Sequence, residues 1–193
     1  MGEGCYLCGV NGAYGPDTND KKTENKMKKT NSLTRRQLIA VCCVVVAFGT
    51  VMHFVHEMPF YNHFLSLIFP ANECVWEHMK MVFWPFVLMG IWLCLRRRSL
   101  GALGGPVAAG LLAMPVTIGL FYVYWPFTHH SILIVDIILY TVVMIVGVFL
   151  AERWSHNAKM QRLRWLWLAA ALATVLLMAY LTDHAPDNFL FRV

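Results

Sequence analysis

The chain has 193 residues, of which 58% are hydrophobic and 14% are charged. Soluble domains average roughly 45–50% apolar and about 25% charged residues, so this composition excludes a water-soluble domain. The formal net charge is +5, but the lysines and arginines occur in short clusters between apolar runs. This pattern indicates membrane topology, and no nucleic-acid partner is expected.

The N-terminal segment differs in composition from the rest of the chain. Residues 1–31 contain Gly, Asn, Thr, Asp and five lysines without apolar periodicity. Such a segment cannot bury enough apolar surface to offset the entropy lost on ordering. The sequence therefore predicts a disordered basic tail over residues 1–34 and a membrane domain over residues 35–193.

Five apolar stretches follow the tail, each near the ~20 residues with which a helix crosses the hydrocarbon core. Only helices and closed barrels satisfy the backbone inside lipid, and continuous rather than alternating apolarity favours helices. The predicted fold class is therefore all-α, an integral membrane bundle of five transmembrane helices in a lipid bilayer. The predicted spans are approximately residues 38–58, 73–95, 100–125, 130–151 and 163–182.

The basic residues predict how the spans are oriented. Fourteen of the 16 lysines and arginines precede span one, or lie between spans two and three or between spans four and five. These three segments fall on one side of the membrane, which the positive-inside rule assigns to the cytoplasm. The N-terminus is therefore predicted to be cytoplasmic and the C-terminus extracytoplasmic.

With this orientation, the other ionisable residues gather on the outer side. Seven of the eight histidines fall there, and so does every acidic residue after the tail except Glu152. His53 and Glu57 are four residues apart near the end of span one, so they are expected to share a helical face. His129 and Asp136 are seven apart around the start of span four and are also expected to share one.

Span two brings further charges into the outer half of the membrane. Asn72 is the expected N-cap, which would place Glu73, Glu77 and Lys80 along one stripe of the helix. An ionisable group facing lipid costs at least ~2.5–3.5 kcal/mol. Lys80 and Asp136 are therefore expected to face the interior, with Lys80 neutralised by Asp136 or Glu77. Spans one, two and four are expected to surround a polar pocket that opens to the outside.

A zinc-dependent hydrolase or transferase is the first hypothesis for this pocket. Catalytic zinc sites commonly use three His or carboxylate ligands plus water, and zinc lowers the pKa of that water towards ~7. Because the pocket opens at the membrane surface, the expected substrate is a lipid or a lipid-linked molecule. The spacing from His53 to Glu57 does not match the H-E-x-x-H signature. The candidate metal ligands are His53, Glu57, His78 and His129; the candidate catalytic residues are Glu73 or Glu77 as base, with Lys80 and Asp136 as electrostatic support.

Two other interpretations of the same residues stay open. Glu, His, Asp and Lys side chains at graded depth can relay protons or bind an ion in a proton- or metal-ion-coupled transporter or channel. Alternatively, the charges form a structural network that holds the helices of a membrane subunit together. The sequence does not indicate an oligomeric state.

A short sequence signature adds a resemblance to a known family. His53-Phe54-Val55-His56-Glu57 and, further on, Asn72-Glu73-Cys74-Val75-Trp76-Glu77-His78-Met79-Lys80 with the later Pro85 resemble the motif of an uncharacterised family of small prokaryotic multi-pass membrane proteins. That family's motif is H-F-x-aromatic-E followed by N-E-S-x-W-E-H-x-K. His56 stands where the motif has an aromatic residue, and Cys74 where it has serine.

The resemblance is confined to one part of the chain, roughly residues 50–86, and it brings no known activity. It implies a prokaryotic cytoplasmic membrane as the location of the protein. It also implies that the matched polar residues act as a unit. These residues are His53, Glu57, Asn72, Glu73, Trp76, Glu77, His78 and Lys80.

Overall fold

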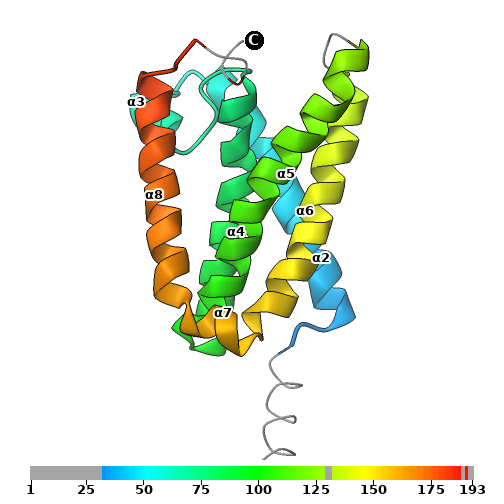
Figure 1. The fold of residues 1–193 in the computed structure, drawn as a ribbon, viewed down its shortest axis with the longest axis vertical. Coiled ribbons are helices and arrows are strands. Elements are labelled where there is room, and N and C mark those ends of the chain that lie inside the picture. The colour runs from blue at the N-terminus through cyan, green and yellow to red at the C-terminus, as the bar shows by residue number, and fades with distance from the viewer. Residues whose placement is uncertain (1–31, 129–131, 188–189, 191–193) are drawn as a thin grey trace, which may run out of the picture. The chain divides into compact units, whose positions relative to one another are not determined.

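The structure is a computed structural model that describes residues 32–128, 132–187 and 190 (Figure 1). Its main elements are five helices that are long and apolar enough to cross a membrane. The described residues contain helices and no strand, which confirms the all-α fold class and the predicted number of long apolar helices. The predicted tail lies almost wholly outside the described residues. The long helices are α2 (Arg35–Phe54), α4 (Val75–Arg97), α5 (Gly104–Thr128), α6 (Leu133–Ser155) and α8 (Arg164–Asp183). Shorter helices are the 3-10 helices η1 (Val55–Glu57) and η2 (Leu100–Leu103), and the α-helices α3 (His63–Ser66) and α7 (Ala158–Arg162).

The first helix begins and ends earlier than its hydropathy predicts. Thr34 and Gln37 form a capping box, in which each side chain accepts a hydrogen bond from the backbone N–H of the other. This cap sets the start of α2 at Arg35. At the other end, Met58 has extended backbone angles of φ −80° and ψ 143°. Because a residue that precedes proline avoids the α-helical region, Pro59 keeps the helix from continuing to residue 58.

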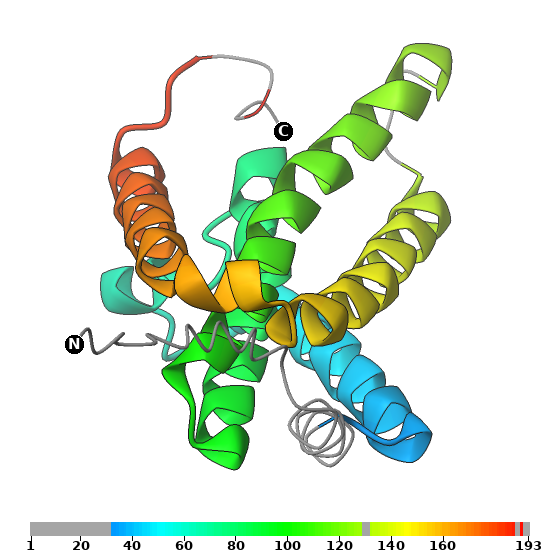
Figure 2. The ribbon, with the colours of Figure 1, turned by 60° about the horizontal axis from the view of Figure 1, so that its bottom comes forward.

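Successive long helices run in opposite directions, so their ends form two groups (Figure 1). The His53 end is where α2, α5 and α8 finish and α4 and α6 begin, and it also holds η1 and α3. The Arg97 end holds η2 and α7, and Figure 2 shows α7 crossing this end between α6 and α8. The assignment of the Arg97 end to the cytoplasm stays a prediction. The basic residues at the Arg97 end are Arg35, Arg36, Arg96, Arg97, Arg98, Arg153, Lys159, Arg162 and Arg164.

Helix α4 lies at the centre of the bundle and has more buried residues than any other described helix. Phe83 and Phe86 on this helix are both 0% exposed. Gly110 on α5 faces Phe86 so closely that an added Cβ would lie 2.9 Å from the Phe86 Cβ. Small residues therefore let the neighbouring helices approach the aromatic side chains of α4. By contrast, α8 lies at the edge of the bundle, and Met178 is its one buried residue.

Candidate functional site

The site begins with the turn that precedes α4. The Asn72 side-chain oxygen accepts a hydrogen bond from the Cys74 backbone N–H at 3.0 Å. Cys74, with extended angles of φ −71° and ψ 152°, is the N-cap, and the helix starts at Val75. The prediction that Asn72 caps a helix containing Glu73 is therefore wrong. Glu73 lies in the loop and does not share the helical stripe of Glu77.

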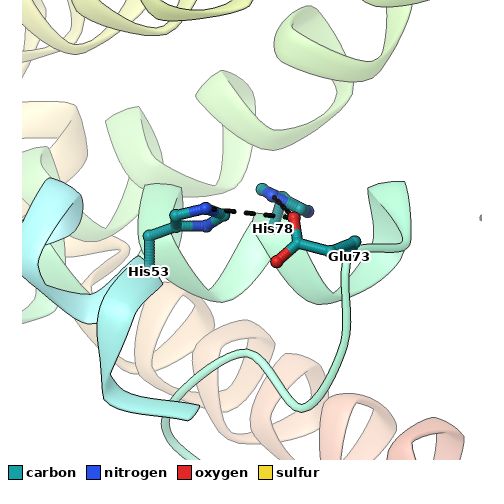
Figure 3. A group of neighbouring side chains, drawn as sticks. All are labelled: His53, Glu73 and His78. Atoms are coloured by element: carbon teal, nitrogen blue, oxygen red, sulfur yellow. Dashed lines mark ion pairs between the residues drawn. The ribbon is translucent and has the colours of Figure 1, made fainter. Parts of the chain in front are cut away.

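Glu73 instead lies beside two histidines that come from different helices (Figure 3). Its Oε2 atom is 3.9 Å from His53 Nε2 on α2 and 3.6 Å from His78 Nε2 on α4. The two imidazole rings have centroids 5.2 Å apart. One ligand atom from each of His53, Glu73 and His78 lies within 4.8 Å of the other two, so this group could hold a metal ion.

The protonation of His78 suits metal binding. Its Nδ1 atom is 2.8 Å from the backbone oxygen of Cys74. Because a carbonyl oxygen only accepts hydrogen bonds, Nδ1 is the donor, and in the neutral tautomer with this proton Nε2 has the lone pair. Nε2 is the atom that faces Glu73. Histidine ligands in metal sites commonly donate their second ring N–H to a carbonyl or carboxylate in this way, which fixes the ring orientation.

The distances in the cluster come close to those of a metal site. Ligand atoms bound to tetrahedral zinc at 2.0–2.1 Å lie roughly 3.3 Å from one another. The separations of 3.6 and 3.9 Å from Glu73 to the two histidines exceed that value by about 0.3 and 0.6 Å, and the ligand atoms of the two histidines lie within 4.8 Å of each other. The side chains of His53, Glu73 and His78 are 29%, 49% and 30% exposed. A site with three protein ligands and solvent access leaves a position open for water or substrate.

Of the other two predicted ligands, the structure places only Glu57. Glu57 is exposed in η1, because α2 ends at Phe54 and the expected one-turn spacing from His53 is lost. Its carboxylate is not part of the three-residue cluster. His129 lies outside the described residues, so its role as a ligand stays a prediction.

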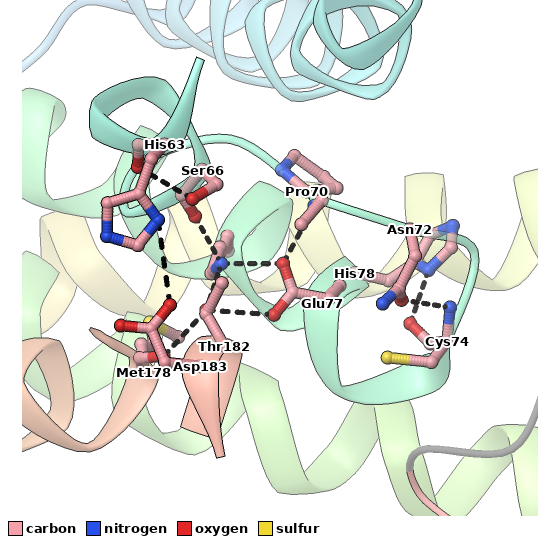
Figure 4. Close-up of polar contacts among 12 residues, drawn as sticks. His63, Ser66, Pro70, Asn72, Cys74, Glu77, His78, Met178, Thr182 and Asp183 are labelled. Carbon is pink, nitrogen blue, oxygen red and sulfur yellow. Dashed lines mark hydrogen bonds and ion pairs between the residues drawn. The ribbon is translucent and has the colours of Figure 1, made fainter. Parts of the chain in front are cut away.

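A buried ion pair lies next to the cluster (Figure 4). Lys80 Nζ is 2.6 Å from Glu77 Oε2, and the two side chains are 0% and 2% exposed. The ammonium also donates to the Ser66 backbone oxygen at 2.6 Å and to Thr182 Oγ1 at 2.7 Å. All three of its N–H groups are therefore satisfied. Of the two expected partners for Lys80, the structure pairs it with Glu77.

Asp136 has a different partner. Its carboxylate accepts a hydrogen bond from the hydroxyl of Tyr124, which joins α6 to α5. Matched depth in the membrane was the reason to expect Asp136 near Lys80, but depth does not define the direction in which a helix points its side chain. These polar residues thus form separate groups: the cluster of His53, Glu73 and His78, the ion pair on α4 that Thr182 connects to α8, and this contact between α5 and α6.

Sequence reasoning missed the groups that complete the ion pair. Thr182, near the end of α8, donates to Glu77 Oε1 at 3.0 Å, and the Ala71 backbone N–H donates to Glu77 Oε2 at 2.8 Å. The polar hydroxyl of Thr182 near the end of an apolar span was the available signal. Backbone groups such as the oxygen of Ser66 leave no trace in a sequence pattern.

Comparison with known proteins gives the chain a family. A family model described as a family of unknown function, DUF6512, matches residues 26–193. The chain belongs to DUF6512. The match to DUF6512 contains every residue of the cluster and of the buried ion pair, and it agrees with the resemblance to an uncharacterised family. No curated protein and no solved structure matches the chain.

Proposed function

We propose that the protein is a membrane-embedded metalloenzyme in which His53, Glu73 and His78 bind a divalent metal, with zinc as the best fit. The observation that carries the proposal is the convergence of three ligand atoms within 4.8 Å. Two imidazoles and one carboxylate are a ligand set of catalytic zinc sites. The hydrogen bond from His78 Nδ1 to the Cys74 carbonyl supports this assignment, since it directs the Nε2 lone pair to the cluster.

Hydrolysis or group transfer is the chemistry that such a site supports. A metal held here would polarise a carbonyl or phosphoryl oxygen and lower the pKa of a coordinated water. Of the two predicted bases, Glu77 already accepts hydrogen bonds from Lys80, Thr182 and the Ala71 amide. The proposal therefore assigns Glu73 to the ligands and gives Glu77 and Lys80 a supporting role.

The surroundings of the cluster support a lipid or lipid-linked substrate. Exposed aromatic side chains at the His53 end include Phe54, Phe60 and Phe64. Phe64 lies on α3, a short helix of four residues. Apolar side chains on short segments of this kind lie at the boundary between headgroups and acyl chains. A substrate with an acyl anchor would thus reach the cluster from the bilayer surface.

An ion- or proton-coupled carrier is less compatible with the described helices. A carrier needs polar groups along a path through the membrane. On α4, the buried side chains beyond Lys80 are all apolar up to the Arg97 end. The buried residues in this stretch are Met81, Val82, Phe83, Pro85, Phe86, Met89, Gly90 and Leu93.

Metal analysis of the purified protein tests the proposal. We expect about one zinc per chain in the wild type, consistent with the one three-residue group found among the described residues. The variants His53→Ala, Glu73→Gln and His78→Ala should lose zinc and any hydrolase activity towards lipid esters or lipid-linked phosphates, and still elute as folded protein. His63→Ala is the matched control, because His63 is 71% exposed at the same end and lies outside the cluster. A wild type that stays free of zinc after loading would overturn the proposal.

A further inference from the structure

We infer that the buried pair of Glu77 and Lys80 positions the metal ligand Glu73, an inference that rests on the proposed function. The pair attaches the loop from Pro59 to Cys74, here called the ligand loop, to helix α4. Glu77 accepts the Ala71 N–H at 2.8 Å, two residues before Glu73. Lys80 donates to the backbone oxygen of Ser66 at 2.6 Å, at the end of α3. Two points of one loop are thus held by one ion pair.

Glu73 needs such support more than the other two ligands do. His53 lies on α2 and His78 on α4, so the hydrogen bonds of regular helices fix their backbones. Glu73 lies in the ligand loop, and its side chain is 49% exposed, so packing does little to hold it. Ligands are placed accurately only where surrounding groups lock them, which makes the loop anchors decisive for this carboxylate.

The anchors surround Glu73 on both sides. On the N-terminal side, the Ala71 amide is held by Glu77, and the backbone oxygen of Pro70 accepts the Tyr61 hydroxyl at 2.9 Å. On the C-terminal side, the Cys74 amide is held by the Asn72 side chain at 3.0 Å. The short segment between these anchors therefore has little freedom to move the carboxylate away from the histidines.

Burial makes the ion pair a rigid anchor. Lys80 and Glu77 are 0% and 2% exposed, so neither solvent water nor salt weakens their attraction as it would at a surface. The pair also reaches α8 through Thr182, whose Oγ1 lies 2.7 Å from Lys80 Nζ and 3.0 Å from Glu77 Oε1. The position of Glu73 thus depends on α8 as well, although α8 contributes no ligand among the described residues.

The decisive variant is Glu77→Met/Lys80→Met. It removes both charges at once, so neither is left buried without its partner, and replacement of a buried ion pair by apolar residues is compatible with folding. It also takes away the acceptor of the Ala71 amide and the donor to Ser66. Thr182→Val removes one hydroxyl of the network, and Thr182→Ser, which keeps the hydroxyl, is its matched control.

Three measurements on the full-length protein in detergent distinguish positioning from a general loss of stability. We expect the double variant to bind zinc about 10–100-fold more weakly, the range found when groups that orient metal ligands are removed. Its cobalt(II) absorption spectrum at saturating cobalt should differ from that of the wild type, because the Glu73 carboxylate is no longer held at the metal. In the absence of metal, hydrogen exchange of the Ala71 and Cys74 amides should be faster in the double variant than in the wild type. Thr182→Val should shift each readout in the same direction, and Thr182→Ser should behave as the wild type.

The outcomes separate this inference from the proposed function. If the double variant binds zinc with wild-type affinity and gives the wild-type cobalt spectrum, the positioning role is wrong while the metal site stands. If the wild type binds no metal, the proposed function is wrong, and unchanged exchange of the Ala71 amide in the double variant then rejects the loop anchor as well. Should the double variant fail to fold, a Thr182→Val protein indistinguishable from Thr182→Ser overturns the inference.

Discussion

His53 at the end of α2 and His78 near the start of α4 hold their imidazole rings 5.2 Å apart, with an angle of 40° between the ring planes. The rings belong to the first two long helices of the bundle, which the ligand loop connects. A metal bound between them would link the two helices and the loop directly.

The first prediction follows from this link. Zinc at 100 times its dissociation constant should raise the free energy of unfolding by about 2.7 kcal/mol, because it binds the folded state and not the unfolded chain. Thermal or denaturant unfolding in detergent, with zinc or with a chelator, measures the shift. The His53→Ala protein should show no dependence on zinc. Equal zinc dependence in both proteins would place the metal elsewhere.

The second prediction compares two glycines of α5. A Cβ added at Gly105 would lie 2.7 Å from the backbone oxygen of Ala151, whereas one added at Gly119 meets nothing within 4 Å. Gly105→Ala should therefore destabilise the protein by about 1–3 kcal/mol, because the backbone of α6 has to move. Gly119→Ala should instead stabilise it by about 0.5–1 kcal/mol through a better helix propensity.

Equilibrium unfolding of the two glycine variants in the same detergent checks this difference. The two substitutions add the same methyl group to the same helix, so each serves as the control for the other. Equal effects of the two would contradict the close approach of α5 and α6 at Gly105.

The third prediction concerns an ion pair at the Arg97 end. Arg97 Nη2 is 2.8 Å from Glu152 Oε2, with side chains 6% and 12% exposed, and Glu152 also accepts the Leu33 N–H at 2.8 Å. Glu152→Gln should lower the free energy of unfolding by about 3 kcal/mol, because it leaves the arginine charge uncompensated in a buried place. Arg97→Gln combined with Glu152→Gln should lose less than the sum of the single losses.

A double-mutant cycle in unfolding experiments measures this coupling between Arg97 and Glu152. Arg98→Gln is the control, since Arg98 is exposed and follows the last residue of α4. Additive losses in the cycle would show that the contact contributes nothing to stability.

The fourth prediction is a pH dependence that arises in the ligand loop. Burial, assisted by the negative charge of Glu77, raises the pKa of Tyr61 from 10.0 to about 12. The unfolded chain releases this proton near pH 10 and the folded protein near pH 12, so the stabilising contribution is complete below pH 10 and is lost as the pH rises to about 12. Tyr61→Phe should remove this part of the slope of stability against pH.

Ultraviolet difference titration of the tyrosines measures this pKa directly. The signal missing from Tyr61→Phe should be one that titrates near pH 12 in the wild type. A missing signal near pH 10 would contradict the burial of this phenol beside Glu77.

The fifth prediction tests which side of the membrane the His53 end and the Arg97 end face. In a variant without its six cysteines, a membrane-impermeant maleimide added to intact cells should label His63→Cys and not Ser99→Cys. Both positions are exposed, at the His53 end and the Arg97 end respectively. Permeabilised cells, in which both should react, are the control. The reverse pattern would contradict the predicted cytoplasmic N-terminus.

Hydropathy predicted the fold well because it acts over whole helices. Each span averages many residues, so small errors at the ends do not change the number of spans. The bounds moved where a local feature decided them, as at Pro59, which ends the first span early. The pairing of Glu77 with Lys80 was also within reach, since residues three apart on a helix are neighbours.

The candidate site was predicted only in part, because a periodic sequence pattern does not predict the path of a loop or the rotation of a helix about its axis. Cys74 rather than Asn72 caps α4, and this shift of two residues moves Glu73 from the helix to the loop beside His53. Asp136 contacts Tyr124 rather than Lys80, because the position of a residue along a helix does not define the direction in which its side chain points. The Ala71 amide is a backbone group, which no side-chain pattern reveals.

Phe83 and Phe86 fill the middle of the bundle and leave the two membrane surfaces without polar communication along α4. A molecule bound at the cluster therefore meets apolar packing along α4 in the direction of the Arg97 end. If the cluster binds a metal as proposed, its chemistry would take place at the His53 end alone.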